Sequence, residues 1–342
     1  MLLELLALVF AIFVLLLASG IAYQQHGLRR DRRKHPAPGR VIPIGSRRLH
    51  IYETGFGGPV VVFESGLASS SLTWNPVQQI VAGRTRAISY DRAGIGWSDE
   101  PGEARTLASM VGDLHALLEA SGNPSPYILV GHSFGALLAR AYASLHPDGV
   151  AGLVLVDPVS LDFWADCSKK DQRRLRLGAR LSRRGALLAQ TGVVRFALDA
   201  LASGRTRLPQ AIAKASAGEA TGTVSRLTGV VQKLPSSLRP AVQAHWSNAK
   251  SFRAMAEYLD VLPMCAKEGR AKLISSELPL TILSAGDATP EELAEREVWV
   301  KRSTRGRHIQ IADSGHWLPL EHPEQVAAAV FELIEYLREP GP

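Results

Sequence analysis

The residues best suited to chemistry form the run Gly-His-Ser-Phe-Gly at positions 131–135. An apolar stretch, 127–130, precedes this run, and a helical pattern, 134–146, follows it. A G-x-S-x-G sequence between a strand and a helix is typical of a sharp turn that exposes the serine hydroxyl at a sheet edge and directs the helix N-terminus toward developing negative charge. We therefore expect Ser133 to be a nucleophile, with His132 beside it in the wall of the substrate pocket.

A serine hydroxyl attacks efficiently only when a base takes its proton, and that base must come from a loop at the same sheet edge. Residues 309–317 read Ile-Gln-Ile-Ala-Asp-Ser-Gly-His-Trp, which predicts a strand followed by a glycine-containing turn. His316 lies in this turn, and a final helical pattern, 323–338, follows it. We expect His316 to be the base, and we expect His308, at the start of the strand, to point elsewhere.

These two residues need a framework, and the sequence supplies apolar runs that alternate with helical patterns. The runs lack the polar alternation of a half-exposed strand, so they indicate a mostly parallel sheet covered on both faces, with an antiparallel hairpin around Gly45. The predicted strands are 49–52, 60–63, 87–90, 127–130, 153–156, 280–283 and 309–312, and the predicted helices are 74–82, 105–121, 134–146, 290–302 and 323–338. The predicted fold class is therefore α/β.

One interval, 159–277, interrupts this alternation with helical and loop composition. We interpret it as a large helical lid inserted between two parts of the core, 41–158 and 278–342. Its apolar residues either line a substrate pocket or form the lid's own core, and the sequence leaves both roles open. These residues are Leu161, Phe163, Trp164, Leu175, Leu177, Leu181, Trp246, Phe252, Met255, Tyr258 and Met264.

The N-terminus is the most hydrophobic part of the chain. The stretch 5–23 holds nineteen residues without a charge, which is about the length that crosses a bilayer core as a helix. We interpret 1–23 as a transmembrane anchor and 24–40 as a basic linker. The alternative is a cleaved secretory signal with small residues at 18–20, but Glu4 stands where such signals carry basic residues. The basic residues after the helix predict a cytoplasmic body, whereas a signal would export it.

The net charge of +7 on 342 residues suggests nucleic-acid binding until the basic residues are located. Residues 29–48 contain eight Arg or Lys residues and one Asp, and residues 169–184 have the same balance, so the rest of the chain is net acidic. Neither island is interleaved with aromatic residues, which argues against a nucleic-acid partner and leaves an anionic lipid surface or a solvated face. Cys167 and Cys265 belong to no Cys/His cluster, so we expect no zinc site, while a single disulfide between them stays open.

Three motifs together carry a family resemblance. GHSFG at 131–135, DRAGIGWS at 91–98 and SGHW at 314–317 each fall on the expected element and resemble the α/β-hydrolase fold superfamily, in particular serine-hydrolase members with a DRAGxGWS signature. The resemblance covers about 40–160 and 278–338, and the lid matches nothing. Haloalkane dehalogenases and epoxide hydrolases of this fold have an aspartate at the nucleophile position. A serine there therefore favours acyl transfer to water.

The resemblance implies a triad in which a carboxylate orients His316 while Ser133 attacks, and it implies no metal or organic cofactor. Most members take the acid from the loop after the seventh strand, where this chain has Asp287 two positions earlier than usual. Others take it from the end of the sixth strand, where Asp157 follows an apolar run. We favour Asp157, with Asp287 as the alternative and Asp313 behind both. The unused carboxylates would serve turns or caps.

Acyl transfer also needs two backbone N–H donors for the oxyanion. Phe134, the residue after the nucleophile, is the first expected donor. In this superfamily the second donor comes from a His-Gly-x sequence after the third strand. Here the segment reads Ser-Gly-Leu, so Leu67 is the expected donor. In the DRAGIGWS segment, Trp97 is expected to reach the pocket.

Together these features predict a membrane-anchored serine hydrolase that cleaves carboxylic esters of small-molecule or lipid-like type through an acyl-enzyme. An aminopeptidase or amidase of the same fold is the first alternative, and it would need a lid carboxylate to bind the substrate amine. The choices are Asp199, Glu219, Glu257, Asp260 and Glu268. A non-catalytic, hydrolase-like binding protein is the second alternative, although binding alone needs none of the triad side chains. Nothing in the sequence indicates an oligomeric state.

Overall fold

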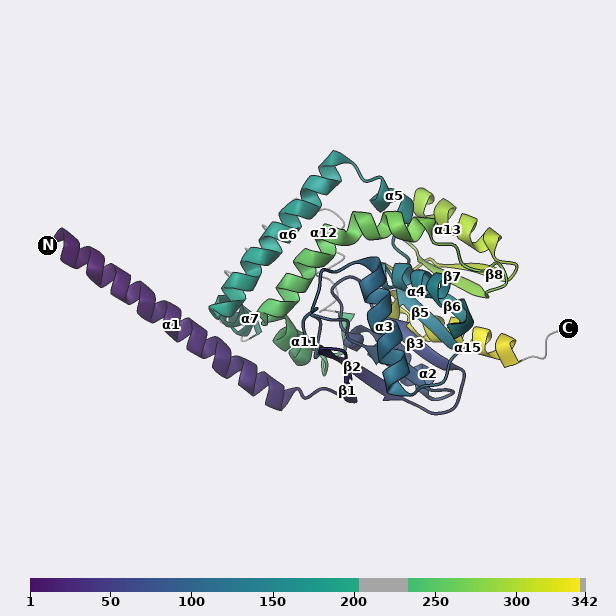
Figure 1. Ribbon diagram of the computed structural model, residues 1–342, viewed down its shortest axis with the longest axis horizontal. Coiled ribbons are helices and arrows are strands. Elements are labelled where there is room, and N and C mark those ends of the chain that lie inside the picture. The colour runs from purple at the N-terminus through teal and green to yellow at the C-terminus, as the bar shows by residue number, and fades with distance from the viewer. Residues whose placement is uncertain (203–232, 339–342) are drawn as a thin grey trace.

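The computed structural model describes residues 1–202 and 233–338, which form an eight-stranded sheet flanked by helices and one long N-terminal helix that leaves the body (Figure 1). The strand order is β1-β2-β4-β3-β5-β6-β7-β8. β2 runs antiparallel to β1 and β4 and all other neighbours are parallel, which confirms the mostly parallel sheet and the hairpin around Gly45. The strands are β1 Arg40–Ile44, β2 Arg47–Thr54, β3 Val60–Glu64, β4 Ala87–Tyr90, β5 Tyr127–His132, β6 Val150–Val156, β7 Leu280–Ala285 and β8 Gly306–Ile311.

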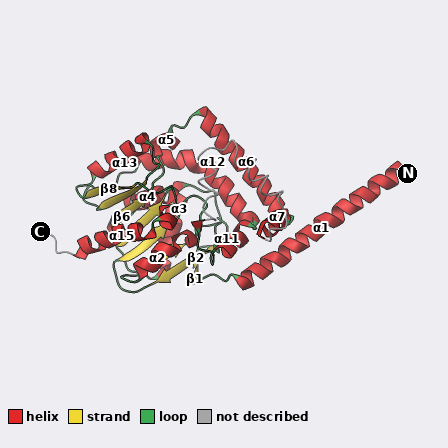
Figure 2. Ribbon diagram, turned by 180° about the vertical axis from the view of Figure 1, so that it is seen from behind, coloured by secondary structure: helices red, strands yellow, loops and turns green. Residues whose placement is uncertain are grey.

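Both faces of the sheet are buried, because successive side chains of a strand point to opposite sides. On β3, Val60 and Val62 belong to one apolar core, and Val61 and Phe63 belong to the other. Helices α3, α4 and α13 cover the first core, and α2 and α15 cover the second (Figure 2). All five predicted core helices are present. Their bounds are α2 Asn75–Ala82, α3 Leu107–Ser121, α4 Phe134–Leu145, α13 Pro290–Arg302 and α15 Pro323–Arg338, and short helices lie at η1 Ser71–Trp74, η2 Pro147–Gly149 and α14 Leu318–Glu321.

In the described part of the lid, two long helices, α6 (Lys169–Gln190) and α12 (Ala249–Ala271), pack along each other (Figure 1). Small residues on α6 permit the close approach, since a Cβ added at Gly185 would lie 2.6 Å from Cδ1 of Phe252. The serine before α6 caps its first turn by accepting a hydrogen bond from the backbone N–H of Asp171. The shorter lid helices are α5 Leu161–Ala165, α7 Val193–Ala202 and α11 Arg239–Trp246.

Two expectations about the lid can be answered from its residues. Cys167 and Cys265 are both buried and free, so the disulfide that the sequence left open does not form. The carboxylate candidate Glu219 lies outside the described residues.

The N-terminal helix α1 (Leu2–Lys34) is longer than the predicted anchor. It continues without interruption through most of the stretch interpreted as a linker, so only residues 35–39 connect it to β1. The physical reason is local: Gln, Arg and Lys are good helix formers, and the first strong helix breaker is Pro36, which also disfavours helical geometry at the residue before it. The apolar half of α1 is exposed along its length. It is the one helix of the described chain that is long and apolar enough to cross a membrane.

Candidate active site

Ser133 lies at a strained turn between β5 and α4. Its backbone has φ +54° and ψ −118°, a conformation that residues other than glycine rarely adopt. Both motif glycines are needed for this turn. A Cβ at Gly131 would lie 2.6 Å from the Cα of Ala136, and one at Gly135 would lie 2.2 Å from the carbonyl oxygen of Glu64. The two glycines thus permit the turn that places the serine at the carboxyl edge of the sheet, because neither carries a side chain that would collide with the backbone.

His316 and Asp157 meet at the same edge of the sheet, although 159 positions separate them. His316 lies in the loop after β8, and its Nδ1 donates a hydrogen bond of 2.6 Å to Oδ2 of Asp157, which directly follows β6. With the proton on Nδ1, the neutral ring keeps its lone pair on Nε2, as a general base requires. Asp287 and Asp313 are both exposed, and neither forms a hydrogen bond or an ion pair with His316 in the described structure.

A third residue, Arg296 on α13, completes the environment of Asp157. Its Nη1 lies 2.9 Å from Oδ1 of Asp157, and the backbone N–H of Ala285 donates to the same oxygen at 3.1 Å. Burial alone would raise the pKa of Asp157, but the hydrogen bond from His316 and the charge of Arg296 hold this pKa well below its usual range. Sequence reasoning missed Arg296, because no motif distinguishes it from the other charged residues of its helix.

The candidate triad lines a cavity of about 110 Å³ between the core and the lid. Phe134 and Leu67, the two expected oxyanion donors, lie in its wall together with Ser133 and His316. The lid contributes apolar side chains from α5, α6 and α12. They are Trp164, Leu175, Leu259 and Leu262, of which the first two were among the apolar lid candidates. The cavity therefore pairs one polar, catalytic wall with one apolar wall.

His132 does not line this cavity, contrary to expectation. Its side chain is 1% exposed, and its Nε2 donates a hydrogen bond of 2.7 Å to the carbonyl oxygen of His316. Burial, together with the nearby ring of His316, lowers the pKa of His132 to about 3, so the ring is neutral. Neighbouring residues at the end of a strand point to opposite sides. His132 therefore lies behind Ser133 and supports the loop that carries the base.

Trp97 also lies away from the cavity. Its ring packs 4.9 Å from that of His50 and 4.5 Å from that of His245, and its Nε1 donates to the carbonyl oxygen of His35 at 3.0 Å. It therefore joins the core to α11 and to the connection that follows α1. The expectation that it reaches the pocket is wrong.

Arg92, in the same DRAGIGWS segment, holds the loop that carries Leu67. Its guanidinium donates to the backbone carbonyl of Ser65 at 2.6 Å and to that of Gly66, and it pairs with Glu64. The carbonyl of Gly66 and the N–H of Leu67 belong to one planar trans peptide and point in opposite directions. By binding the carbonyl, Arg92 fixes the direction of the N–H.

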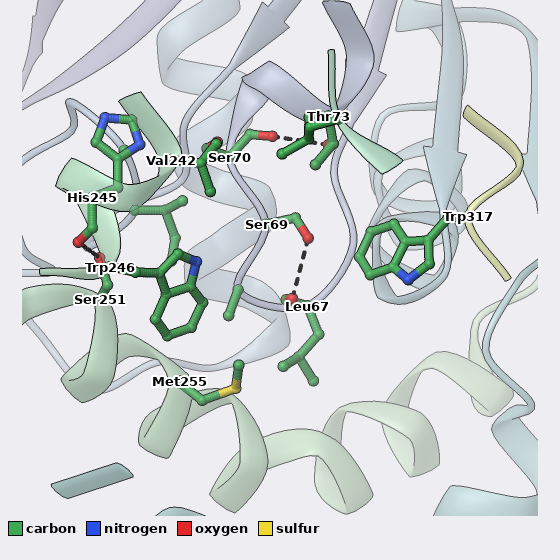
Figure 3. A pocket seen from close by; sticks show the side chains of 14 residues that line it. Leu67, Ser69, Ser70, Thr73, Val242, His245, Trp246, Ser251, Met255 and Trp317 are labelled. Atoms are coloured by element: carbon green, nitrogen blue, oxygen red, sulfur yellow. Dashed lines mark hydrogen bonds between the residues drawn. The ribbon is translucent and has the colours of Figure 1, made fainter. Parts of the chain in front are cut away.

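Leu67 also lines a second, smaller cavity (Figure 3). Ser69 and Trp317 line it from the core, and Trp246 and Met255 line it from the lid. Its volume of about 30 Å³ is room for about one or two waters. The cavity beside Ser133 is therefore the larger of the two that adjoin the oxyanion loop.

Comparison with known families gives a match to the alpha/beta hydrolase fold over residues 59–323. Among curated relatives, the chain is 36% identical over 107 residues to the uncharacterized protein YqjL of Bacillus subtilis, an alignment covering 31% of this chain and 42% of that protein. An AB hydrolase superfamily protein of Gibberella zeae is 25% identical over 316 residues, covering 82% and 87%. A haloalkane dehalogenase of Sphingobium indicum is 32% identical over 138 residues, covering 39% and 46%. The chain thus spans less than half the length of YqjL and of the dehalogenase.

Solved structures show the same fold at low identity. A thermophilic esterase from Thermogutta terrifontis superposes with a TM-score of 0.60 at 20% identity, covering 87% of this chain and 98% of the esterase. The enol-lactonase from Burkholderia xenovorans superposes with a TM-score of 0.57 at 18% identity, covering 86% of this chain and all of the lactonase.

Proposed function

The chain belongs to the α/β-hydrolase fold family, and on that basis we propose that it is a serine hydrolase of carboxylic esters, with Ser133 as nucleophile, His316 as base and Asp157 as orienting acid. The observation that carries this proposal is the 2.6 Å hydrogen bond between His316 and Asp157 in the wall of the cavity that also contains Ser133. A serine, an aspartate and a histidine follow β5, β6 and β8, respectively, and these are the residue types that acyl transfer uses as nucleophile, orienting acid and base.

The proposed reaction has two halves. The Oγ of Ser133 attacks the ester carbonyl while Nε2 of His316 takes the hydroxyl proton, and the N–H groups of Phe134 and Leu67 stabilise the oxyanion. His316 then gives its proton to the leaving alcohol, which leaves an acyl group on Ser133. A water molecule, deprotonated by His316, attacks the acyl group and releases the carboxylic acid, and the proton returns to Ser133. Throughout, Asp157 holds the ring and stabilises its protonated form.

The nucleophile and the lid favour an apolar ester as substrate. A serine at the elbow forms an acyl-enzyme, whereas members of this fold that open carbon–halogen bonds or epoxides use an aspartate there. Among the described residues, five of the six that line the cavity from the lid are apolar, and these suit an apolar acyl or alcohol group. The six are Val159, Ser160, Trp164, Leu175, Leu259 and Leu262.

The contacts of three lid carboxylates that the structure describes argue against the aminopeptidase alternative. Asp199 accepts from the hydroxyl of Tyr23, Glu257 pairs with Arg105, and Asp260 pairs with Arg183. None of these acids lines the cavity beside Ser133. Glu292 on α13 does line it, but this side chain accepts the N–H of Thr289 in its own helix cap. We therefore expect esters to be cleaved faster than amino-acid arylamides.

We also propose that α1 anchors the protein as a single transmembrane span, with the catalytic body on the cytoplasmic side. The exposed apolar side chains between Leu5 and Ile21 support the span, and the arginines that follow support the orientation. Alkaline extraction of membranes tests the anchor: an anchored chain stays in the pellet, and a processed, exported chain does not.

The first test of the activity is labelling of the membrane fraction with a fluorophosphonate, which reacts with activated serines. We expect wild-type protein to be labelled, Ser133→Ala to be unlabelled, and p-nitrophenyl esters of increasing chain length to reveal the preferred acyl group. Equal labelling of both proteins, or no ester hydrolysis by folded protein, would overturn the proposal and favour a non-catalytic binding protein.

A further inference from the structure

The outer side of α6 carries leucines and arginines side by side. Its inner side, which packs on α12, holds small residues and Leu175, whereas the outer leucines contact little else. The exposed leucines are Leu177 (57%), Leu181 (55%), Leu187 (63%) and Leu188 (48%). Exposing four leucines on one side of a helix is unfavourable in water. It is favourable at a lipid interface, because the leucines enter the boundary of the acyl chains while the arginines reach the phosphates.

The arginines of this outer side have few protein partners. Arg183 pairs with Asp260, and Arg174 pairs with Asp171. Within the described residues, no carboxylate lies at ion-pairing distance from Arg173, Arg176, Arg180 or Arg184, which are all exposed. The helix therefore presents a net positive surface that an anionic partner would neutralise.

The end of α6 touches α1 inside the proposed membrane span. A Cβ added at Gly20 would lie 2.3 Å from the carbonyl oxygen of Thr191, and one at Gly192 would lie 2.5 Å from the carbonyl oxygen of Gly20. Gly20 precedes the end of the apolar run, Tyr23, by about 5 Å along a helix. The turn between α6 and α7 therefore lies at the membrane boundary. The first turn of α7, next to it, exposes two more apolar side chains, Val193 (51%) and Phe196 (67%).

A buried polar cluster joins the lid to α1 near the membrane boundary. Arg195 on α7 is 2% exposed and donates to Gln24 (2.9 Å) and Asp31 (2.6 Å) of α1 and to the hydroxyl of Ser247 (2.7 Å). The amide of Gln24 in turn donates to the backbone carbonyl of Ser247 at 2.9 Å. The anchor and the lid are thus docked to each other, and α6 runs across the direction of α1 rather than along it (Figure 1).

We propose that the outer side of α6 and the α6–α7 turn form a second membrane contact, which lies flat on the anionic leaflet of the bilayer that α1 crosses. The inference rests on the proposed transmembrane anchor and adds to it a lipid-facing lid. Leu175 faces the cavity beside Ser133 from the inner side of the same helix. One helix diameter, about 10 Å, therefore separates the proposed nucleophile's cavity from lipid. The substrate class that fits this placement is an ester dissolved in the membrane.

The test uses the full-length protein reconstituted in nanodiscs of phosphatidylcholine and phosphatidylglycerol. A fluorophore is attached at Leu188→Cys or Phe196→Cys, at Leu8→Cys in α1, or at Val298→Cys, which is exposed on α13, far from α1 (Figure 1). Lipids carry a quenching nitroxide either at the headgroup or deep in the acyl chain. Wild-type protein treated in parallel measures any labelling of the two buried native cysteines.

We expect headgroup nitroxides to quench the labels at 188 and 196, deep nitroxides to quench the label at 8, and neither to quench the label at 298. If only the label at 8 is quenched, the anchor stands and the second contact is wrong. If the label at 8 is not quenched either, the anchor itself is wrong. The two failures are therefore distinguishable.

Charge reversal tests the electrostatic part. Each basic residue near an anionic surface raises the equilibrium constant for binding to that surface about fivefold. Arg180→Glu/Arg184→Glu is therefore expected to lower the equilibrium constant for contact between the lid and the bilayer by at least about 25-fold. Lys301→Glu/Arg302→Glu, with the same change in charge on exposed positions of α13, is the matched control. Equal quenching at 188 in both double variants would show that the arginines do not bind lipid.

Discussion

Arg296 and His316 bind opposite oxygens of a single carboxylate, that of Asp157: Arg296 lies 2.9 Å from Oδ1, and His316 lies 2.6 Å from Oδ2. The carboxylate cannot rotate without breaking one of the two contacts. Arg296 is itself held by the hydroxyl of Ser284 (2.8 Å) and the backbone carbonyl of Pro158 (2.8 Å). We infer that Arg296 positions the acid, which in turn positions the proposed base.

Replacement of Arg296 by Gln is expected to lower kcat about 10- to 100-fold with little change in KM, because the imidazole loses its fixed orientation. Once the nearby positive charge is gone, proton uptake by the hydrogen-bonded pair of Asp157 and His316 should become easier, so the acid limb of the pH–rate profile should move to higher pH. Steady-state kinetics with a p-nitrophenyl ester across pH measures both effects. Arg302→Gln, at an exposed position of the same helix, is the control, and Arg296→Lys should recover part of the activity. An unchanged pH profile would assign Arg296 a merely structural role.

The choice between the two candidate acids predicts a sharp difference between two variants. Asp157→Asn removes the acceptor for Nδ1 of His316 and favours the wrong tautomer, so kcat is expected to fall about 10⁴-fold. Asp287→Asn changes an exposed side chain that does not contact His316, so its kcat should stay within about twofold of wild type. The two variants differ from wild type by the same chemical change, and a larger loss in Asp287→Asn would reverse the assignment.

The parts of the site that could be predicted from sequence are those with local causes. The turn at Ser133 needs glycines two positions on either side, and the buried strands need continuous apolar runs, so both leave a pattern in neighbouring residues. The positions of Arg296 and Arg92 depend on contacts between distant segments, for which no local pattern exists. His132 and Trp97 show a different limit: each belongs to a recognisable motif, but the direction of its side chain is set by the pleat of β5 in one case and by packing against α11 in the other.

The contact between Arg92 and the Leu67 loop predicts a defect in transition-state binding. Arg92→Gln should leave the carbonyl of Gly66 with the N–H of Ser69 (3.2 Å) in place of two donors, so the N–H of Leu67 is held less firmly. The expected cost is about 10- to 100-fold in kcat, a part of what a lost oxyanion donor costs. Arg105→Gln is the matched control: Arg92 (2.7 Å) and Arg105 (2.9 Å) both donate to the hydroxyl of Tyr258, but Arg105 does not contact the loop. In Arg92→Gln the affinity for an alkylphosphonate transition-state analogue should fall together with kcat, whereas in Arg105→Gln it should not fall. Equal losses in both variants would point to general destabilisation of the contacts around Tyr258.

The neutral, buried ring of His132 predicts that the protein loses stability in mild acid. In the unfolded chain an imidazole titrates near pH 6.5, whereas the folded-state pKa of His132 is about 3. Between these values the unfolded state binds a proton that the folded state does not, so the free energy of unfolding falls as pH falls, by up to about 1.4 kcal/mol per pH unit. His132→Gln keeps an amide donor for the carbonyl of His316 and should make this dependence smaller, as measured by urea unfolding at pH 7 and pH 5. Part of the dependence should remain, because burial also lowers the pKa of His245, to about 4. The half-buried His322, changed to Gln, serves as control for loss of an imidazole that donates to a backbone carbonyl, here that of Asp313 at 3.0 Å. A slope that stays the same in His132→Gln would mean that His132 takes up its proton equally in the folded and unfolded states.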